Sequence, residues 1–313
     1  MSMKVSRRLT VPAAIISAVA LLLSILFALS DRERLDLDRS VLQEAGDWVE
    51  LPHGAVSYRW SGPENGPVVV LVNPFSVPMY VWERNADVLA RDGYRVLRYD
   101  LYGRGLSNRP RVRYDVSFFV GQLESLIRAL AVPTPVRLAG VSMGAEIAAA
   151  YTARHPELVA RVCLMDPRAV DITWKTTFPM GVPGLGEYLM TVAVIPFVLS
   201  SPASDFFRPE SVPDWGEKYR EQTRYRGFRR ALLSTMRSFD KNYMETYTRV
   251  GELGTPVLLI WGEKDKTVPI SYAPRIQSAI PQAELHVIPN AGHLAIYERA
   301  DLVNPILSAF LAR

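Results

Sequence analysis

Residues 136–154 read VRLAGVSMGAEIAAAYTAR, and the architecture of the whole chain can be inferred outward from them. The apolar run Val136–Val141 predicts a buried strand, and the alanine-rich run Met143–Arg154 predicts a helix. The turn between them, residues 140–144, reads Gly-Val-Ser-Met-Gly and matches the pattern G-x-S-x-G. A serine on so tight a strand-to-helix turn adopts strained backbone angles, and its neighbours must be small because other segments approach closely. We therefore expect Ser142 to stand on a sharp turn, with the amide end of a helix directed at it.

Strands and helices are expected to alternate on both sides of this turn. The β-branched run Val68–Val72 suits a strand buried on both faces, as in a parallel sheet. The other expected strands are Trp48–Leu51, Ala55–Trp60, Tyr94–Tyr99, Ala160–Met165, Pro256–Trp261 and Glu284–Ile288. The other expected helices are Tyr80–Arg91, Ser117–Leu130, Ala273–Ile280 and Ala300–Leu311. Alternation at this spacing predicts an α/β fold with a doubly wound, mostly parallel sheet.

The alternation is interrupted after Pro167. Residues 168–248 are rich in proline, glycine, aromatic residues and short helical patterns, and they predict a helical cap inserted into the fold. The cap would divide the core into a first part, residues 47–167, and a second part, residues 249–313. Within the cap, Leu189–Leu199 is strongly apolar and is flanked by Phe178, Phe206 and Phe207. These side chains indicate either an apolar substrate or a segment that packs the cap onto the core, and the sequence leaves both open.

The N-terminus carries a basic leader followed by an apolar run. Lys4, Arg7 and Arg8 precede an uncharged run from Val11 to Ser30. Roughly twenty apolar residues are enough to cross a bilayer as a helix. We therefore expect residues 1–30 to form a transmembrane anchor whose basic end stays in the cytoplasm. The catalytic domain would then be extracytoplasmic in a single-pass membrane protein, and residues 31–46 would form a charged stalk.

A cleaved signal peptide is the alternative interpretation of the same leader. Signal peptides have a shorter apolar region, of about 7–15 residues, and a cleavage site of small residues. The stretch from Ala28 to Ser30 could serve as that site, and the protein would then be secreted. The length of the run favours the uncleaved anchor.

Composition limits the classes of ligand. The formal net charge is +4, and the 36 basic residues are scattered along the chain without a basic block interleaved with aromatics. This pattern argues against a nucleic acid partner. The chain has one cysteine, Cys163, so no intrachain disulfide can form and no zinc-type spacing exists. We expect neither a metal nor a cofactor, and a small-molecule substrate.

A serine hydroxyl needs a base to become a nucleophile, and the chain has four histidines. His293 lies in a loop after the last strand and before the last helix, and such loops gather with the serine turn at the carboxyl edge of a doubly wound sheet. The other three have ordinary structural explanations: His53 is in an early hairpin turn, His155 ends the helix after the serine, and His286 is within a strand. His293 is therefore the predicted base.

The base needs a carboxylate that holds its tautomer and stabilises the imidazolium. Asp265 lies in the loop after the penultimate predicted strand, so the chain order is serine, aspartate, histidine. Glu263 in the same loop and Asp166 after the strand Ala160–Met165 are its rivals. We predict a triad of Ser142, Asp265 and His293.

From about residue 55 to its end, the chain resembles the α/β-hydrolase family, in its capped lipase- and esterase-like branch. Four stretches carry the resemblance in the family's order: DLYGRGLS at 100–107, the turn at 140–144, WGEKDKTVP at 261–269 and NAGH at 290–293. The resemblance implies Ser142 as nucleophile, His293 as base and Asp265 as its partner. It also implies that the turn at Gly103 and Gly105 is structural.

One stretch departs from the family pattern. Members of the family carry His-Gly after the third strand, where this chain has Asn73-Pro74 followed by Phe75. Proline lacks an N–H and has a fixed φ, whereas the family uses a flexible glycine. By the resemblance, the N–H of Phe75 would be one oxyanion donor. The N–H of Met143, at the start of the helix, would be the second.

These features lead to a functional expectation. We expect a serine hydrolase that cleaves carboxylic esters of apolar acyl groups through an acyl-enzyme on Ser142. Hydrolysis of lactones, amides or carbon–carbon bonds, and cofactor-free haloperoxidation, are alternatives on the same triad. Relatives of the fold that use an aspartate nucleophile are disfavoured because position 142 is serine. A ligand-binding member without catalysis is the alternative from another class, and the substitution at Asn73-Pro74 motivates it.

Overall fold

A computed structural model describes residues 7–169, 177–201, 203–239 and 242–313, and only the backbone of residues 7–13, 39, 44 and 45. Its centre is an eight-stranded sheet in the order β1-β2-β4-β3-β5-β6-β7-β8. The strands are β1 (Trp48–Leu51), β2 (Gly54–Ser61), β3 (Val68–Val72), β4 (Arg95–Tyr99), β5 (Val136–Val141), β6 (Val159–Met165), β7 (Val257–Gly262) and β8 (Glu284–Ile288). β1 and β2 pair antiparallel with their neighbours, and β3 to β8 are parallel. The predicted doubly wound, mostly parallel sheet is confirmed.

The central strands are buried on both faces. Every residue of β3 (VVVLV) and of β7 (VLLIWG) is buried. The edge strand β8 is largely exposed, with only its last residue buried. Continuous apolar runs therefore occupy the middle of the sheet, as expected for parallel strands covered by helices on both sides.

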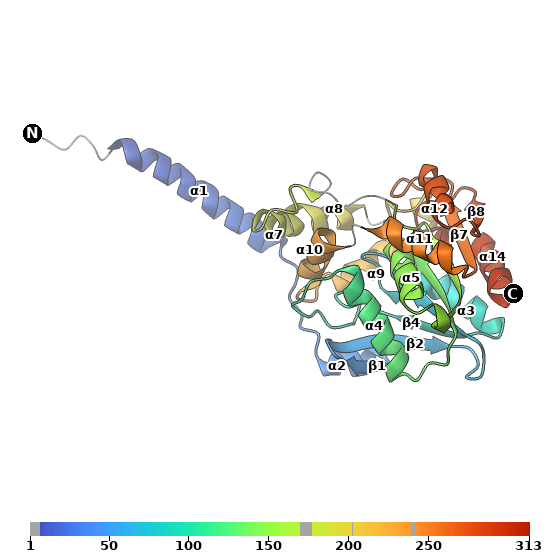
Figure 1. Ribbon diagram of the computed structural model, residues 1–313. Coiled ribbons are helices and arrows are strands. Elements are labelled where there is room, and N and C mark those ends of the chain that lie inside the picture. Colours follow the sequence, from blue (N-terminus) through green and yellow to red (C-terminus); the bar gives the residue numbers. More distant parts are fainter. Residues whose placement is uncertain (1–6, 170–176, 202, 240–241) are drawn as a thin grey trace, which may run out of the picture.

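Helices cover the two faces of the sheet (Figure 1). On one face α4 (Val116–Ala129) and α5 (Met143–Arg154) pack together, and α11 (Tyr243–Leu253) lies on α5 and on α12 (Ala273–Ala279). On the other face α3 (Glu83–Arg91) packs on α14 (Ala300–Ala312). Short helices connect these elements: η1 (Met79–Trp82), η2 (Pro156–Leu158), η5 (Ile270–Tyr272) and α13 (Ala295–Glu298). The carboxyl ends of the parallel strands are left free to carry loops.

The chain between β6 and β7 forms no strand in the part that the structure describes. It contains α7 (Leu185–Leu189), a π-helical turn η3 (Met190–Val194), α8 (Ile195–Ser200), η4 (Pro209–Ser211), α9 (Trp215–Gln222), α10 (Phe228–Ser238) and α11. Aromatic contacts join this insertion to the core, because Trp215 lies edge-on to Tyr297 with ring centroids 4.8 Å apart. The expected cap boundary at residue 248 falls inside α11, which packs on the core helix α5. Part of the predicted cap, residues 170–176, 202 and 240–241, lies outside the described residues.

The membrane prediction is wrong. The apolar N-terminal run lies in α1 (Arg7–Ser30), which extends away from the globular body (Figure 1). A bilayer-spanning helix needs about twenty consecutive apolar residues. Among the described residues, no helix reaches the length and apolarity of a membrane span. This finding contradicts the prediction of a single-pass membrane protein with an extracytoplasmic domain. Lys4, the first basic residue of the leader, lies outside the described residues.

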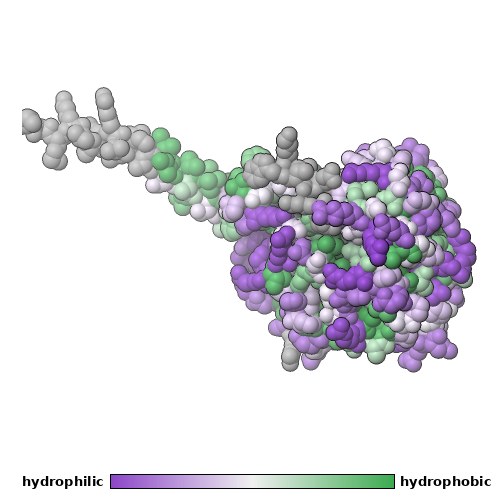
Figure 2. Space-filling model, in the orientation of Figure 1, coloured by the Kyte–Doolittle hydropathy of each residue, from purple (hydrophilic) through white to green (hydrophobic). Residues whose placement is uncertain are grey.

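The described end of α1 and the segment after it contact the helical insertion. Apolar side chains along α1 are exposed (Figure 2), but the ring of Phe27 stacks on Tyr188 with centroids 6.3 Å apart. The backbone of residues 34–35 bonds to Arg224, and Leu35 forms a β-bridge with Tyr225. Asp38 then caps α2 (Arg39–Ala45). The residues expected to form a stalk thus lie against the protein.

Candidate active site

Ser142 stands on the turn between β5 and α5. Its backbone angles are φ 55° and ψ −119°, a strained conformation that costs about 1–3 kcal/mol. The turn can be this sharp because its flanks are glycines. A Cβ on Gly140 would lie 2.2 Å from the Gly144 carbonyl oxygen, and one on Gly144 would lie 2.3 Å from the carbonyl oxygen of Val72. The Ser142 N–H donates to the carbonyl of Met165, which ties the turn to the end of β6 (2.8 Å).

His293 lies in the loop after β8 and is 5% exposed. Its backbone N–H donates to the carbonyl of Asp205 in the insertion (2.7 Å). The N–H of the preceding Gly292 donates to Oε2 of Glu298 (2.8 Å). The loop is therefore held from both sides, by the insertion and by α13.

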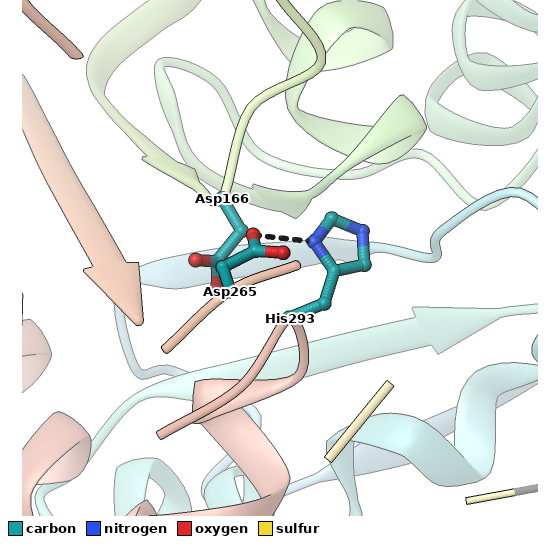
Figure 3. Close-up of side chains that lie close together, drawn as sticks. All are labelled: Asp166, Asp265 and His293. Carbon is teal, nitrogen blue, oxygen red and sulfur yellow. Dashed lines mark hydrogen bonds and ion pairs between the residues drawn. The ribbon is translucent and has the colours of Figure 1, made fainter. Parts of the chain in front are cut away.

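Asp265 lies in the loop after β7 and faces His293 (Figure 3). Its Oδ2 is 2.7 Å from Nδ1 of His293. Its Oδ1 accepts hydrogen bonds from the N–H groups of Thr267 and Val268, both at 2.8 Å. The structure thus brings two of the three predicted triad residues together, with the carboxylate fixed by the turn that follows it.

The other candidates for base and partner have different contacts. Glu263 is exposed, and its carboxylate accepts from the N–H of Asn290 and pairs with Lys264. His155 follows the last residue of α5, and its Nε2 lies 2.7 Å from Oε1 of Glu124 in α4. His53 and His286 are exposed. None of these side chains forms a hydrogen bond or ion pair with the side chain of Asp265 or His293 among the described residues.

Asp166, named from the sequence as a rival of Asp265, lies in the same cluster as the predicted pair, which the sequence did not predict. It lies directly after β6, is 0% exposed, and has φ 43°. Asp166, Asp265 and His293 each offer an atom of the metal-binding type, and these atoms lie within 4.8 Å of one another. A carboxyl pair with an imidazole could hold a metal in principle, yet the 2.7 Å contact between Asp265 and His293 is an ordinary hydrogen-bond distance. The carboxyl groups of Asp166 and Asp265, which the sequence offered as alternatives, therefore both lie next to His293.

Electrostatics in this cluster follow from burial and charge. Burial disfavours the imidazolium of His293, but the hydrogen bond and charge of Asp265, with Asp166 and Asp205, outweigh it and raise its pKa to about 9. Burial, and then the charge of Asp265, raise the pKa of Asp166 well above its ordinary value. The cluster therefore favours protons on both Asp166 and His293.

The two predicted oxyanion donors belong to the serine turn and to the loop after β3, whose Asn73 carbonyl oxygen would lie 2.5 Å from a Cβ on Gly144. Met143 is the first residue of α5, and Phe75 follows β3. Neither backbone N–H donates to another residue that the structure describes, so both are available to a ligand. Asn73, which differs from the family pattern, is buried. Its Nδ2 donates a hydrogen bond to the carbonyl of Tyr99 (2.8 Å), which ties the loop to the end of β4.

Arg104 holds the same loop and was not predicted. Its guanidinium is fully buried and donates to the carbonyls of Phe75 (2.8 Å) and Tyr102 (3.1 Å) and to the hydroxyl of Thr235 in α10 (2.9 Å). Burial lowers the pKa of Arg104 to about 9. The signal that could have found it is its place in the DLYGRGLS stretch, which was interpreted only as a turn.

Comparisons with known proteins extend these observations. The family described as alpha/beta hydrolase fold matches residues 67–300. The 2-hydroxy-6-oxononadienedioate/2-hydroxy-6-oxononatrienedioate hydrolase of Klebsiella pneumoniae is 28% identical over 237 residues, 74% of this chain and 81% of that enzyme. The solved enol-lactonase from Burkholderia xenovorans LB400 matches with a TM-score of 0.74 at 22% identity, over 85% of this chain and 100% of that one. A thermophilic esterase from Thermogutta terrifontis matches with a TM-score of 0.73 at 21% identity, over 85% and 98%.

The family match spans most of the chain, from the turn before β3 to the start of α14. The two solved structures are similar in fold and, at these identities, show the fold alone. The sheet order, the strained serine turn and the loops at the carboxyl edge agree with the family match. The chain therefore belongs to the α/β-hydrolase fold family.

Proposed function

We propose that the protein is a serine hydrolase that cleaves carboxylic esters through an acyl-enzyme on Ser142. The observation that carries the proposal is the buried pair of Asp265 and His293, 2.7 Å apart, at the sheet edge from which the strained Ser142 turn also rises. A strained serine, a buried imidazole and an orienting carboxylate are the parts that acyl transfer requires. The N–H groups of Phe75 and Met143, which have no acceptor among the described residues, supply the remaining part.

The reaction would run in two halves. Oγ of Ser142 attacks the ester carbonyl and gives its proton to Nε2 of His293, while Asp265 holds the proton on Nδ1 and stabilises the imidazolium. Collapse of the tetrahedral intermediate breaks the ester bond, and the imidazolium gives its proton to the leaving alcohol. Water then attacks the acyl-enzyme with His293 as base, and the acid departs as Ser142 regains its proton. The two backbone N–H groups stabilise the oxyanion in both halves.

An apolar acyl group fits the surroundings of His293. The backbone of Phe206 and Phe207 lies against the His293 loop, since a Cβ on Gly292 would lie 2.7 Å from the Phe207 nitrogen. Phe206 is buried against Trp215, whereas Phe207 keeps 37% of its surface exposed. A partly exposed phenylalanine whose backbone adjoins the His293 loop is consistent with an apolar rather than a charged acyl chain.

Ester hydrolysis by matched variants tests the proposal. Turnover of a short p-nitrophenyl ester should fall by about 10⁴-fold or more in Ser142→Ala and in His293→Ala, because each removes a group on which the others depend. A fluorophosphonate probe should label the wild type and not Ser142→Ala. Unlabelled wild-type protein would favour a ligand-binding member of the fold, and Ser142→Ala with wild-type turnover would remove Ser142 as nucleophile.

Hydrolysis of a carbon–carbon bond is the second candidate. It is motivated by the relative at 28% identity, whose name gives it a 2-hydroxy-6-oxo-dienedioate substrate. The same serine and histidine could serve both reactions. Comparing kcat/KM for a vinylogous 2-hydroxy-6-oxo acid with that for a p-nitrophenyl ester decides between them, and the larger value identifies the natural bond type.

A further inference from the structure

The carboxyl group of Asp166 has no role in the reaction described above, yet it lies in the catalytic cluster. β6 pairs with β7 and β7 pairs with β8, so the residues after these strands, Asp166, Asp265 and His293, meet at one edge. Figure 3 shows the Asp166 side chain directed at that of Asp265. Asp166 is 0% exposed and Asp265 6%, so bulk water does not screen the two carboxyl groups from each other.

The hydrogen-bond donors around each carboxyl group differ in number. Asp265 receives the N–H groups of Thr267 and Val268 on one oxygen and faces Nδ1 of His293 with the other. Asp166 receives one donor, the N–H of Gly262 on Oδ1 (2.7 Å). Oδ2 of Asp166 has no hydrogen-bond partner among the described residues if it is treated as an ionised oxygen. A buried anionic oxygen without a donor is costly.

Repulsion between like charges strongly disfavours ionisation of both of two adjacent buried carboxyl groups. A negative charge is better stabilised on Asp265, which has more donors, and a proton is better placed on Oδ2 of Asp166, which has none. With that proton, the unpartnered oxygen becomes a donor directed at the neighbouring carboxylate. Both oxygens of the Asp166 carboxyl group then have a hydrogen-bond partner, Oδ1 from Gly262 and Oδ2 with Asp265.

We propose that Asp166 is a neutral carboxylic acid that donates a hydrogen bond from Oδ2 to Asp265 and so positions the carboxylate that orients His293. The proposal rests on the proposed function, because it assigns Asp166 to the positioning of a catalytic pair. It makes Asp166 a positioning residue and leaves Asp265 as the single negative charge opposite the imidazolium. The strained backbone of Asp166, φ 43°, is consistent with a residue held for its side chain's direction.

The titratable groups near Asp166 come from three other segments of the chain. Asp265 lies on the loop after β7 and His293 on the loop after β8, with Asp205 of the insertion beyond the imidazole. Cys163 on the same strand is buried, and burial raises the pKa of its thiol well above the ordinary value, so it carries no charge. Among these described neighbours, only His293 can offset a second negative charge, and it is already paired with Asp265.

Replacement by asparagine tests the proton's location. The amide is isosteric with a neutral acid, so Asp166→Asn still accepts from Gly262 and donates to Asp265. We expect it to keep kcat/KM within about threefold of wild type, whereas Asp166→Ala loses about tenfold or more and Asp265→Asn about 10⁴-fold. If Asp166→Asn is as damaging as Asp265→Asn, then Asp166 is the ionised partner and the proposal is overturned.

A second measurement does not depend on any activity. A proton kept on Asp166 in the folded protein is lost from the unfolded chain above its ordinary pKa of 3.8, so wild-type stability should decline as pH rises beyond that value. Urea unfolding between about pH 5 and about pH 8 should show a smaller decline in Asp166→Asn, which should exceed wild type in stability at the higher pH. Asp36→Asn, which removes an exposed carboxyl group, is the control and should keep the wild-type slope.

The two readouts separate the two hypotheses. Equal pH slopes in wild type and Asp166→Asn would refute the neutral acid, whatever the enzyme does. The expected difference in slope, together with a wild type that neither hydrolyses esters nor reacts with the fluorophosphonate, would refute the proposed function while keeping the proton on Asp166. Circular dichroism of each variant verifies that it is folded.

Discussion

His293 differs from the other three histidines in its surroundings. It is 5% exposed, and its ring faces a carboxylate that is itself fixed by two backbone N–H groups. His53 and His286 are exposed, and His155 pairs with Glu124 at the end of α5. A carboxylate with fixed geometry selects the imidazole tautomer with its proton on Nδ1 and leaves Nε2 able to accept a proton. The chemical difference between identical residues therefore comes from burial and from one hydrogen bond.

The pH dependence of activity follows from this environment. A base must be neutral, and the cluster raises the pKa of His293 from 6.5 to about 9. We expect kcat/KM to rise with pH and to reach half of its plateau between 6.5 and about 9, the lower part of this range applying because a neutral Asp166 contributes less charge. A pH–rate profile of the ester assay measures this midpoint.

The residual activity of Asp265→Asn provides the comparison. Its midpoint should lie at lower pH than that of wild type, since the charge that stabilises the imidazolium is gone. A midpoint that does not move would show that Asp265 has no influence on the base. Folding responds in the same direction as the raised pKa: the stability that His293 contributes is full below pH 6.5 and is lost as pH rises through about 9.

At the level of loops and helices, Arg104 connects the turn after β4 to two other elements. Its three hydrogen bonds reach Phe75 after β3, Tyr102 in its own turn, and Thr235 in α10. Aromatic rings surround it, including those of Phe75 and Phe119, with its guanidinium carbon 5.5 and 5.2 Å from their centroids. The carbonyl of Phe75 is therefore fixed by Arg104, while the Phe75 N–H has no acceptor among the described residues and can bind an oxyanion. This contact couples the insertion to the proposed oxyanion loop.

Arg104→Lys tests that coupling. Lysine keeps the charge but cannot reach three acceptors in a planar fork, so the buried carbonyls of Phe75 and Tyr102 lose donors. We expect the free energy of unfolding to fall by about 2–4 kcal/mol and kcat to fall by about tenfold, with less change in KM. Steady-state kinetics and urea unfolding measure both.

Thr235→Val serves as the matched control for Arg104→Lys. It removes one neutral acceptor at nearly constant volume and leaves the bond to Phe75, so it should cost about 1 kcal/mol and little activity. If Thr235→Val lowers kcat as much as Arg104→Lys does, the effect is general loosening of the insertion rather than the position of Phe75.

At the level of the whole molecule, the N-terminal segment joins parts that are distant in sequence. The carboxylate of Glu33 accepts from the N–H groups of Gly227 (2.8 Å) and Arg229 (2.7 Å) at the start of α10. The guanidinium of Arg229 pairs with Asp31 and Glu33 and bonds to Thr191 in η3. These residues are mostly buried, so the contacts are only weakly screened by solvent. The segment thereby links α1, η3 and α10 into one unit.

Glu33→Ala should weaken that unit. It removes the acceptor for two N–H groups at a helix start and one partner of Arg229, so we expect a loss of about 2 kcal/mol in the free energy of unfolding. Asp36→Ala is the control, because its pair with Arg226 is exposed on both sides and should contribute less than about 0.5 kcal/mol. Thermal or urea unfolding of the two variants compares them directly. Equal losses in both variants would contradict the assigned role of Glu33.

Local patterns in the sequence were sufficient for much of the fold. The runs Val68–Val72 and Val136–Val141 form largely buried parallel strands, because short runs rich in valine and bounded by turn residues suit strands covered on both faces. The G-x-S-x-G turn placed Ser142 because only small residues tolerate the close approach of Val72 and Gly144. The chain order of Ser142, Asp265 and His293 also followed from the alternation of strands and loops, and their catalytic roles remain a prediction.

The tertiary structure decided what depends on long-range contacts. The length of the apolar run in the leader predicted a membrane span, but no helix among the described residues is long and apolar enough to be one. Near the end of α1, the ring of Phe27 stacks on Tyr188. Asp166 became a neighbour of Asp265 only because β6 and β7 lie side by side, a pairing that no local pattern encodes. Its protonation, like the burial of Arg104, follows from the loss of solvent and the donors that other segments supply. Sequence periodicity determines which residues are buried, whereas only the packed chain determines which buried groups meet.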